Sequence, residues 1–481
     1  MNNVLDRDLP RDRDHPTEDG GLARGLSNRH IQLISIGGAI GTGLFMGAGK
    51  TISISGTSII LTYMVIGFFL FFVMRAMGEM LLSNLRYKSF ADFCSAYLGP
   101  WAGFFIGWSY WLTWVVGSIA DYVVVGGYMQ FWFPTLPAWI PAIATLTSLL
   151  LLNMLTVKLF GELEFWFALV KIVAILTLIA VGIYLVSTSF VSPAGVRASL
   201  SHLVEKDAFM PHGVLGFFAG FQIAIFSFAG IELVGTTAAE TKDPERNLPR
   251  AINAVPLRVI IFYVLSLACI ISVSSWKNIS AHVSPFVQLF LAAGFPMVAA
   301  VINFVVTTSA MSAANSGVFS TSRMLYGLAS TKDAPALFRW LTSRSVPVMG
   351  LLFSCLCMLI GILLLFVIPD VMSIFTIVST VSAILFIFVW SLILVAYLVY
   401  RMRNPDLHAK SRFKMPGGIP MASLCLAFFV FVVGLLTLDA DTRSALRVMP
   451  LWFFLLLVAY KLTRRGHRRS ISVLEHAQAA E

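Results

Sequence analysis

The fold of this chain is decided by residues 37–45, which read Gly37-Gly38-Ala39-Ile40-Gly41-Thr42-Gly43-Leu44-Phe45. They lie inside an apolar segment that runs from Ile31 to about Gly49. Each of the four glycines disfavours a helix by roughly 1 kcal/mol relative to alanine. A bilayer tolerates an unwound backbone only where it is buried in protein or lines a wet cavity. The stretch therefore predicts a broken membrane helix, although small residues also suit close helix–helix packing of the GxxxG kind.

An unwound segment of this kind offers two binding sites of opposite charge. The free N–H groups at the start of the half-helix that follows attract an anion, helped by the positive end of the helix dipole. The free carbonyl groups of the preceding half-helix attract a cation. Because a zwitterion carries both charges about one residue apart, residues 37–45 favour a site for the carboxylate and amino groups of an amino acid.

The composition is typical of a membrane protein. The chain has 481 residues, of which 58% are hydrophobic and 12% charged, a balance unlike that of soluble domains. Apolar runs long enough to span a bilayer begin near residues 31, 58, 101, 138, 163, 214, 256, 295, 347, 371, 420 and 447. The sequence therefore predicts an all-α polytopic membrane protein with twelve transmembrane helices. The charged N-terminal residues predict no cleavable signal peptide, and residues 1–25 are expected to form a disordered tail.

The distribution of positive charge predicts the orientation in the membrane. If the N-terminus is cytoplasmic and the spans alternate, 26 of the 34 Lys and Arg residues lie in cytoplasmic tails and loops, six lie outside and two lie within spans. Basic residues concentrate on the cytoplasmic side of membrane proteins, so we expect both termini in the cytoplasm. The net charge of +10 then reflects orientation and requires no nucleic-acid partner.

A second glycine-interrupted segment runs from Gly216 to Glu232. It lies five spans after the first, and an odd number of spans inverts the orientation, so the two segments occupy matching places in two inverted halves. Such a pair is the strongest sequence indication of a transport site, and it weakens the packing interpretation of residues 37–45. We therefore expect a first half at 26–188, a second half at 189–403, two further spans at 404–465 and a cytoplasmic tail at 466–481.

Two ionisable residues, Asp121 and Lys171, lie within predicted spans. An acid in the membrane costs on the order of 3 kcal/mol, so Asp121 is expected to face a cavity or a partner. It would take part either in substrate or proton handling or in a structural polar contact. Lys171 lies about two turns into its span, where it could extend to the near interface. If it instead points inward, it can gain and lose a proton.

Other polar groups inside spans leave two interpretations open. Arg75 and Glu79 lie four residues apart near the cytoplasmic end of their span, either as an exposed i,i+4 pair or as part of an inner gate. The run from Thr307 to Gly317 carries many hydroxyls and an amide, which suggests the wall of an aqueous path, although Ser and Thr also pack between helices. The candidates for this cavity wall are Ser312, Asn315 and Ser316.

The sequence shows no signal for a cofactor, a metal site or an enzyme's catalytic group. All eight histidines lie in predicted tails, loops or span ends, which disfavours haem, a histidine metal site and a Ser/His catalytic pair. The five cysteines are scattered, so neither a disulfide framework nor a metal site is supported. No P-loop is present, and ATP is therefore not expected as the energy source.

Six motifs together resemble the bacterial amino acid transporter family of the amino acid–polyamine–organocation superfamily. They are Asn28-Arg29-His30-Ile31-Gln32-Leu33-Ile34, residues 37–45, Glu164-Phe165-Trp166, Gly230-Ile231-Glu232-Leu233, Ala239-Glu240-Thr241 and Ser320-Thr321-Ser322-Arg323. The likeness covers roughly residues 24 to 465. Residues 44–47, 83–85, 217–224 and 314–319 are further similar to proton symporters of small neutral amino acids within that family.

The resemblance implies a LeuT-like fold, in which ten core helices form an inverted repeat of five plus five with helices 1 and 6 broken, and two helices are added. It implies that the substrate carboxylate meets backbone N–H groups at Gly41–Gly43, and that the amine meets nearby carbonyls of both breaks. Lys171 matches a lysine that replaces the sodium ion of sodium-coupled relatives, and Glu232 matches an acid associated with proton coupling or gating. The expected substrate-binding residues are Gly38, Ala39, Ile40, Gly41, Thr42, Gly43, Ser227, Phe228, Ala229 and Gly230. The expected proton-coupling or gating residues are Lys171, Glu232 and Asp121.

The resemblance thus implies a transporter and no enzyme. We expect proton-coupled uptake of small neutral amino acids, above all D-serine, D-alanine and glycine, across the bacterial cytoplasmic membrane. Permeases for other neutral or aromatic amino acids and amino acid exchangers use the same scaffold and are the alternatives. The expected partners are the amino acid, H⁺ and the lipid bilayer, with no metal or cofactor, and a monomer is expected to suffice for transport.

Overall fold

The computed structural model describes residues 40–87, 89–155, 157–236, 243–368, 370–438 and 440–478. Within these ranges the chain is helical, and the sole β pairing is an isolated antiparallel bridge between Val191 and Arg197. Gly38 and Ala39 of the expected binding stretch lie outside the described residues, as does the expected tail at 1–25. The prediction of an all-α chain is confirmed for the described part.

The helices follow one another with short connections. In chain order they are α2 (Thr42–Phe45), α3 (Gly47–Ser55), η1 (Gly56–Ser58), α4 (Ile59–Ser83), α5 (Phe90–Leu98), α6 (Pro100–Met129), α7 (Trp139–Asn153), α8 (Val157–Ser187), η2 (Leu200–Leu203), α9 (Gly213–Phe226), α10 (Leu233–Thr236), α11 (Pro244–Asn253), α12 (Val255–Arg258), η4 (Val259–Leu265), α13 (Ser266–Val273), η5 (Trp276–Asn278), α14 (Pro285–Ala292), α15 (Pro296–Ser330), η6 (Ala336–Arg339), α16 (Val348–Ile362), η7 (Leu363–Phe366), α17 (Val371–Arg403), α18 (Pro405–Lys410), α19 (Gly418–Leu435) and α20 (Ala440–Gln478).

Nine helical stretches of the described chain are long and apolar enough to cross a membrane. They are Gly47–Ser83, Pro100–Met129, Gly161–Ser187, Pro244–Val273, Pro296–Ser330, Val348–Phe366, Val371–Arg403, Gly418–Leu435 and Thr442–Arg464. Two further apolar helices, α7 and α9, are shorter. The chain is therefore a polytopic helical membrane protein.

Only the second half of the first glycine-rich stretch lies in the described part of the chain, from Ile40 onward. Gly41 precedes α2 in extended backbone conformation (φ −131°, ψ −164°), α2 lasts about one turn, and α3 follows after Met46. At Gly56 the chain turns toward α4 with a φ of 60°, and a Cβ atom there would lie 2.1 Å from the Ala208 carbonyl oxygen, so this turn requires glycine. Met46 has αR backbone angles and its N–H donates to the Thr42 carbonyl over 2.8 Å, so α2 continues into α3 with little interruption. The extended backbone at Gly41 marks the start of this helix, and the residues before Ile40 lie outside the described part.

The second predicted break lies between α9 and α10. Helix α9 ends at Phe226, residues 227–232 form turns, and α10 begins at Leu233. Gly230 adopts a φ of 94°, which residues with a side chain rarely adopt. A 3.1 Å hydrogen bond from the Leu233 N–H to the Gly230 carbonyl closes the turn. The chain is therefore unwound within the glycine-interrupted segment.

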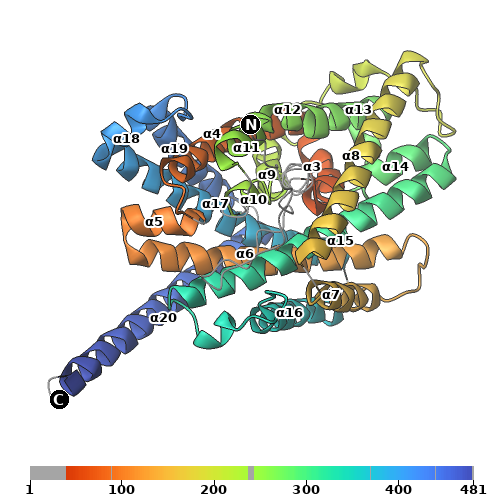
Figure 1. The fold of residues 1–481 in the computed structure, drawn as a ribbon. Coiled ribbons are helices and arrows are strands. Elements are labelled where there is room, and N and C mark those ends of the chain that lie inside the picture. The colour runs from red at the N-terminus through yellow and green to blue at the C-terminus, as the bar shows by residue number, and fades with distance from the viewer. Residues whose placement is uncertain are drawn as a thin grey trace, which may run out of the picture.

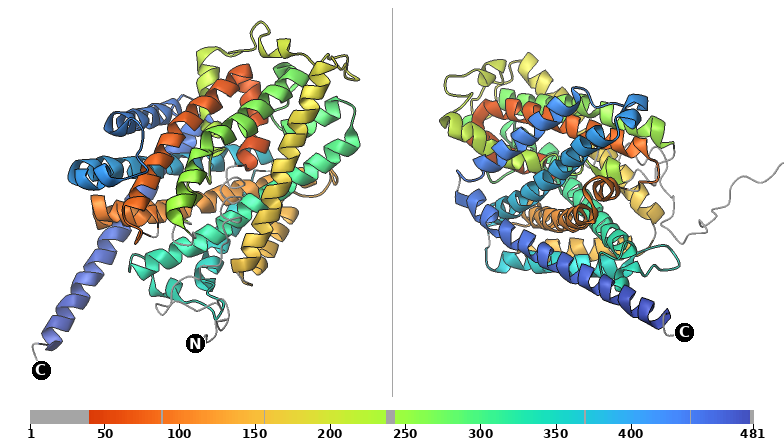
Figure 2. Two further views of the ribbon diagram at one scale, coloured as in Figure 1. Left: turned by 45° about the horizontal axis from the view of Figure 1, so that its top comes forward. Right: turned by 90° about the vertical axis from the view of Figure 1, so that its left-hand side faces the viewer.

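Helix α6 lies near the centre of the bundle (Figure 1). It packs along both α15 and α17, and α15 also contacts α7, α8 and α16. Helix α9 packs against α2, α3, α4 and α17, which brings the two interrupted segments together. Helix α20 packs against α17 and α6, and its C-terminal part extends beyond the other helices (Figures 1 and 2).

The helix formed by α12, η4 and α13 is widened in its middle. The segment η4 is π-helical, and π-helical turns inside α-helices are frequent at functional sites. Tyr263 in this segment is buried, and its hydroxyl donates a 2.8 Å hydrogen bond to the carbonyl oxygen of Ser227. The widened turn therefore supports the unwound residues that follow α9.

Candidate functional site

A small cavity of about 30 Å³ lies where the two interrupted segments meet α6. Its wall is formed by Gly41, Thr42, Gly43, Thr113, Trp114, Gly117, Asp121, Phe226, Ser227, Ala229, Ala313 and Phe386. One water molecule needs roughly 10–15 Å³ of such space, so the cavity has room for about two. Among the expected substrate-binding residues, Gly41–Gly43, Ser227 and Ala229 lie in this wall.

The two interrupted segments touch at Gly43 and Ser227. A Cβ atom added to Gly43 would lie 2.5 Å from the Cα and 2.8 Å from the Oγ of Ser227. No side chain fits between them, so the backbone of Gly43 itself forms the junction. At Gly41 an added Cβ would meet the Ala313 Cβ at 3.7 Å, which is ordinary contact. Gly41 therefore has room for a methyl group, whereas Gly43 has none.

Asp121 supplies a carboxylate to the cavity wall. It is 4% exposed and accepts a 2.6 Å hydrogen bond from Thr42 Oγ1, which ties α6 to the start of α2. The N–H groups of Gly41–Gly43 lie at the start of a helix, where amides have no intrahelical acceptor. The wall therefore combines a negative side chain with backbone donors, and a zwitterion needs this combination.

Lys171 projects from α8 into the protein interior and not toward an interface. It is 1% exposed, and its Nζ donates a 3.2 Å hydrogen bond to the carbonyl oxygen of Ile40, just before α2. Ser309 of α15 donates to the same carbonyl over 3.3 Å. Lys171 also interacts electrostatically with Glu164 and Asp121. The buried ammonium group of Lys171 thus links α8 to the Ile40 carbonyl, and Ser309 links α15 to the same carbonyl.

The residues of the second break divide between the cavity and the packing around it. Ser227 is held by the Tyr63 hydroxyl, 2.9 Å from its Oγ, and by the Tyr263 hydroxyl at its carbonyl. Phe228 is buried and stacks on Tyr263 with ring centroids 4.8 Å apart. Phe228 and Gly230 do not belong to the cavity wall. In the described conformation they position the unwound segment instead.

Glu232 is buried outside the cavity wall. Its Oε1 accepts a 3.3 Å hydrogen bond from the Tyr110 hydroxyl of α6, and the Trp390 indole of α17 lies close to the same carboxylate. Glu232 therefore connects the second break to the two helices that flank it. This placement brings it against α6 and α17 but not against the cavity.

Three polar residues in the middle of α15 face α7 and α8. Ser312 Oγ donates a 2.8 Å hydrogen bond to Glu164 Oε1, and Asn315 Oδ1 accepts a 2.8 Å bond from Asn153. Ser316 lies beside the Glu164 carboxylate as well. These α15 residues, expected as a cavity wall, are not among the residues that line the cavity in the described conformation. They join three helices next to Lys171.

Some residues of the site were not predicted, although their helical spacing in the sequence could have indicated them. Thr113, Gly117 and Asp121 are spaced by four residues, so one face of α6 carries all three into the cavity wall. Glu164 precedes Lys171 by seven residues on α8 and shares its face in the same way. No local pattern marks the remaining wall residues Trp114, Phe226, Ala313 and Phe386.

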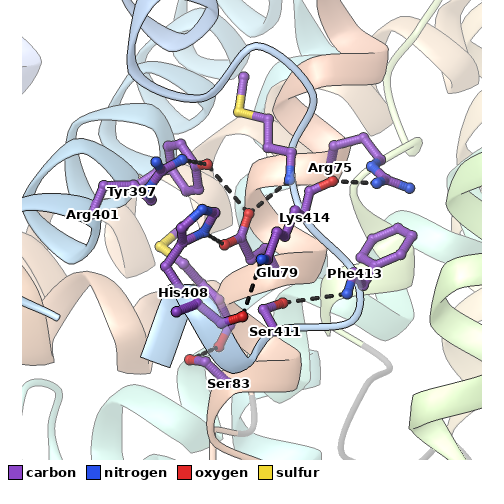
Figure 3. Close-up of polar contacts among 12 residues, drawn as sticks. Arg75, Glu79, Ser83, Tyr397, Arg401, His408, Ser411, Phe413 and Lys414 are labelled. Atoms are coloured by element: carbon purple, nitrogen blue, oxygen red, sulfur yellow. Dashed lines mark hydrogen bonds and ion pairs between the residues drawn. The ribbon is translucent and has the colours of Figure 1, made fainter. Parts of the chain in front are cut away.

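A separate polar cluster joins the ends of α4 and α17 to the segment around α18 (Figure 3). Its centre is the buried carboxylate of Glu79, whose Oε1 lies 2.5 Å from His408 Nδ1. Its Oε2 accepts hydrogen bonds from the Tyr397 hydroxyl (3.2 Å) and the Met415 N–H (2.7 Å). Arg401 in turn donates to the Tyr397 hydroxyl over 2.9 Å.

Arg75 uses partners other than those of Glu79. Its guanidinium donates to Asn253 Oδ1 over 2.8 Å and to the Lys414 carbonyl oxygen, and it lies 3.8 Å above the Phe413 ring (Figure 3). The two residues thus make separate contacts and both hold the segment before α19 against α4. Arg75 and Glu79 are therefore not paired with each other on an exposed helix face. Their contacts across helices are more compatible with the other interpretation, part of an inner gate.

Replacing Glu79 with alanine is expected to destabilise the fold by about 1–3 kcal/mol for each buried partner that loses its acceptor. The Met415 N–H and the Tyr397 hydroxyl are such partners. Thermal unfolding of the detergent-solubilised protein measures the effect. Ser83→Ala is the matched control, because the Ser83 hydroxyl donates to the Met80 carbonyl and lies near the Tyr97 side chain, and takes no part in the Glu79 contacts described above. Equal melting temperatures for the two variants would contradict the role given to Glu79.

Comparison with known proteins identifies the family. The model of the family described as amino acid permease matches residues 30–473. The chain is 61% identical over 443 residues, 92% of its length and 94% of the relative, to the D-serine/D-alanine/glycine transporter of Escherichia coli (strain K12). It is 49% identical over 449 residues (93% and 96%) to the amino-acid permease AapA of Bacillus subtilis (strain 168). It is 38% identical over 460 residues (96% and 99%) to the probable threonine/serine transporter YbxG of that organism. The chain therefore belongs to the amino acid permease family and is an amino acid transporter, not an enzyme.

Proposed function

We propose that this permease carries small neutral amino acids into the cell together with a proton, and that D-serine, D-alanine and glycine are its substrates. The observation that carries the proposal is the cavity in which Gly41–Gly43 face Ser227 beside the Asp121 carboxylate. Its donors and acceptor suit the two charged groups that all amino acids share. The E. coli relative that is 61% identical is named for these three amino acids.

The size of the cavity supports small substrates. Three aromatic residues, Trp114, Phe226 and Phe386, form much of its wall, and about 30 Å³ remains between them and the backbone. Glycine has no handedness, and a methyl or hydroxymethyl group adds only one or two heavy atoms, so D-alanine and D-serine need little more widening of the cavity than glycine does. An aromatic substrate would have to displace these rings, which disfavours that alternative.

The two charged ends of the substrate are assigned to different parts of the wall. The N–H groups of Gly41–Gly43 bind the carboxylate, because they lie at the positive end of a helix. The ammonium group meets carbonyl groups around Ser227 to Ala229, with Asp121 as the nearby counter-charge. Gly38 and Ala39, expected to contribute carbonyls, lie outside the described residues.

Lys171 is the proposed proton-coupling residue. When protonated, it braces α8 against the Ile40 carbonyl, which immediately precedes the carboxylate-binding amides. Loss of the proton weakens that hydrogen bond and lets the first break move with its substrate toward the cytoplasm. Glu232 is proposed to take part in gating, since it joins the second break to α6 through Tyr110.

The architecture that we propose is a LeuT-like inverted repeat with two added helices. If the stretch Gly47–Ser83 is divided at Gly56 into α3 and α4, the nine long stretches become ten, and the shorter helices α7 and α9 bring the number to twelve spans. The halves are placed at 26–188 and 189–403, and the added pair at 404–465. One chain encloses the cavity, which supports transport by a monomer.

The proposed orientation has both termini in the cytoplasm. It rests on the 26 Lys and Arg residues that the tails and loops of this side would carry, against six on the other. The bacterial origin of the relatives supports the cytoplasmic membrane as the location. Residues 1–25 and 466–481 are then cytoplasmic tails.

Uptake into liposomes that contain the purified protein tests the proposal. With an acidic exterior and a negative interior, labelled glycine and D-alanine should accumulate, and a protonophore should abolish the accumulation. At about −100 mV, one net charge supplies roughly 2.3 kcal/mol, which corresponds to about 50-fold accumulation. Excess D-serine should compete, and excess L-phenylalanine should not.

Other outcomes of the same experiment point elsewhere. Uptake that requires amino acid inside the liposomes and ignores the proton gradient would indicate an exchanger. Competition by L-phenylalanine as strong as that by D-serine would indicate a permease for larger neutral amino acids. The D-isomer assignment fails if L-alanine competes and D-alanine does not.

A further inference from the structure

Glu164 is a buried carboxylate that the transport cycle proposed above leaves unused. It lies on α8, is 0% exposed and precedes Lys171 by seven residues. Seven residues are almost two helical turns, so both side chains share one face of α8, about 10 Å apart along its axis. The two groups interact electrostatically. Ionisable groups buried inside a membrane are costly, and they usually mark ion or proton pathways.

The two oxygens of the Glu164 carboxylate have different surroundings. Oε1 accepts the 2.8 Å hydrogen bond from Ser312. Oε2 is buried and has no hydrogen-bond partner in the described part of the chain. The Asn315 Nδ2 and the Ser316 Oγ lie close to the same carboxylate, each with a hydrogen to donate to it. If Oε2 takes a proton, its O–H group can donate to Ser316 Oγ, which has lone pairs, whereas the ionised carboxylate accepts from the Asn315 amide N–H.

We propose that Glu164 is a second proton-binding site, which accepts the proton of Lys171 and passes it toward the cytoplasm. This inference rests on the proposed function, because it needs Lys171 to be the coupling residue. A water molecule between the two side chains would relay the proton, so that an Nζ–H bond breaks, the water accepts one proton and gives up another, and an Oε2–H bond forms. An ammonium and a carboxylate thereby become a neutral amine and a neutral acid, the form that a buried environment favours. The acid then releases its proton to water and returns to the carboxylate.

The position of Glu164 gives the transfer a direction. In the proposed orientation α8 begins at the cytoplasmic side, so Glu164 lies about 10 Å nearer to the cytoplasm than Lys171. Asp121 of α6 interacts with Lys171 and belongs to the cavity wall. Lys171 therefore lies between a carboxylate at the cavity and a carboxylate on the exit side. Among the described residues, the other groups that interact with Glu164 are neutral and come from α15: Ser312, Asn315 and Ser316.

Glu164→Gln tests the proposal in liposomes, because glutamine keeps the size and the acceptor toward Ser312 but takes up no proton. Accumulation of labelled glycine driven by an acidic exterior should fall from about 50-fold to equality with the outside. Exchange of internal for external glycine should stay within about two-fold of wild type, since it needs no net proton movement. Glu164→Asp, which restores an acid, should recover a large part of the accumulation.

Ser312→Ala is the matched control for a purely structural role. It removes the hydrogen bond to Oε1 and leaves the carboxylate, so a proton site predicts retained accumulation and a structural tether predicts a loss like that of Glu164→Gln. Wild-type accumulation in Glu164→Gln overturns the proposal, and so does a joint loss of accumulation and exchange in both variants. If the proton gradient does not change glycine accumulation by the wild-type protein, the proposed proton coupling is wrong, and the inference about Glu164 is wrong with it.

Discussion

Replacing Lys171 with alanine is expected to abolish uphill uptake while exchange of internal for external amino acid continues. The variant loses the proposed proton site and the hydrogen bond to the Ile40 carbonyl. Wild-type protein moving one net charge at about −100 mV gains enough for about 50-fold accumulation. Without a proton to carry, the variant should bring internal glycine only to the external concentration. Liposome uptake with and without internal substrate measures both activities.

Ser309→Ala is the control for this variant. Ser309 donates to the same Ile40 carbonyl over 3.3 Å, but its hydroxyl carries no charge at any working pH. If the Ile40 hydrogen bond alone mattered, both variants would lose accumulation to a similar degree. We expect Ser309→Ala to accumulate glycine and Lys171→Ala not to. Normal accumulation by Lys171→Ala would remove it as the coupling residue.

Gly43→Ala is expected to reduce transport about 5- to 150-fold. The added Cβ would lie 2.5 Å from the Ser227 Cα, and backbone cannot rotate away as a side chain can. Overpacking of this kind costs about 1–3 kcal/mol, and each 1.4 kcal/mol is a factor of about ten in an equilibrium. The closed junction between the two breaks should therefore be populated less. The initial rate of glycine exchange, which needs no gradient, reports the loss directly.

Gly41→Ala is the control for this variant, because it tests whether any side chain added to the glycine stretch reduces transport or only one that meets Ser227. At Gly41 the added Cβ would meet the Ala313 Cβ at 3.7 Å, and the backbone there has a φ of −131° that any residue adopts. We expect its exchange rate to stay within about three-fold of wild type, since no neighbour must move. Equal losses at both positions would show that contact with Ser227 is not what limits transport.

Much of the architecture could be predicted because its causes are local. Long apolar runs must become helices in a bilayer, so the positions of the spans follow from hydropathy alone. The unwound residues between Phe226 and Leu233 lie within the predicted segment and include Gly230, whereas Gly216 and Gly220 stay inside α9. Glycine lowers the cost of leaving the helix, so its positions indicate the segment but not the exact point of the break.

Lys171 and Asp121 could be singled out because ionisable residues are rare in apolar spans. The sequence left open whether Lys171 extends to the interface, and the structure places it inside the protein.

The direction in which the polar residues of α15 point could not be predicted from the sequence. Its hydroxyls and amide suggested the wall of an aqueous path, yet Ser312 and Asn315 face α8 and α7, and Ala313 occupies the cavity wall. Neighbouring positions on a helix differ by about 100° in direction. The composition of a helix therefore does not say which way each residue points; its rotation against the neighbouring helices does.

By itself, the sequence determined that this protein crosses the membrane many times and interrupts its helices with glycines. It also placed a lone lysine and several lone acids within the spans. Only the tertiary structure decided which of these groups meet: Thr42 with Asp121, Gly43 with Ser227, Ser312 with Glu164, and Glu79 with His408. The reason is physical. Helix formation depends on each residue and its near neighbours, whereas these contacts depend on how helices far apart in the chain rotate and pack against one another.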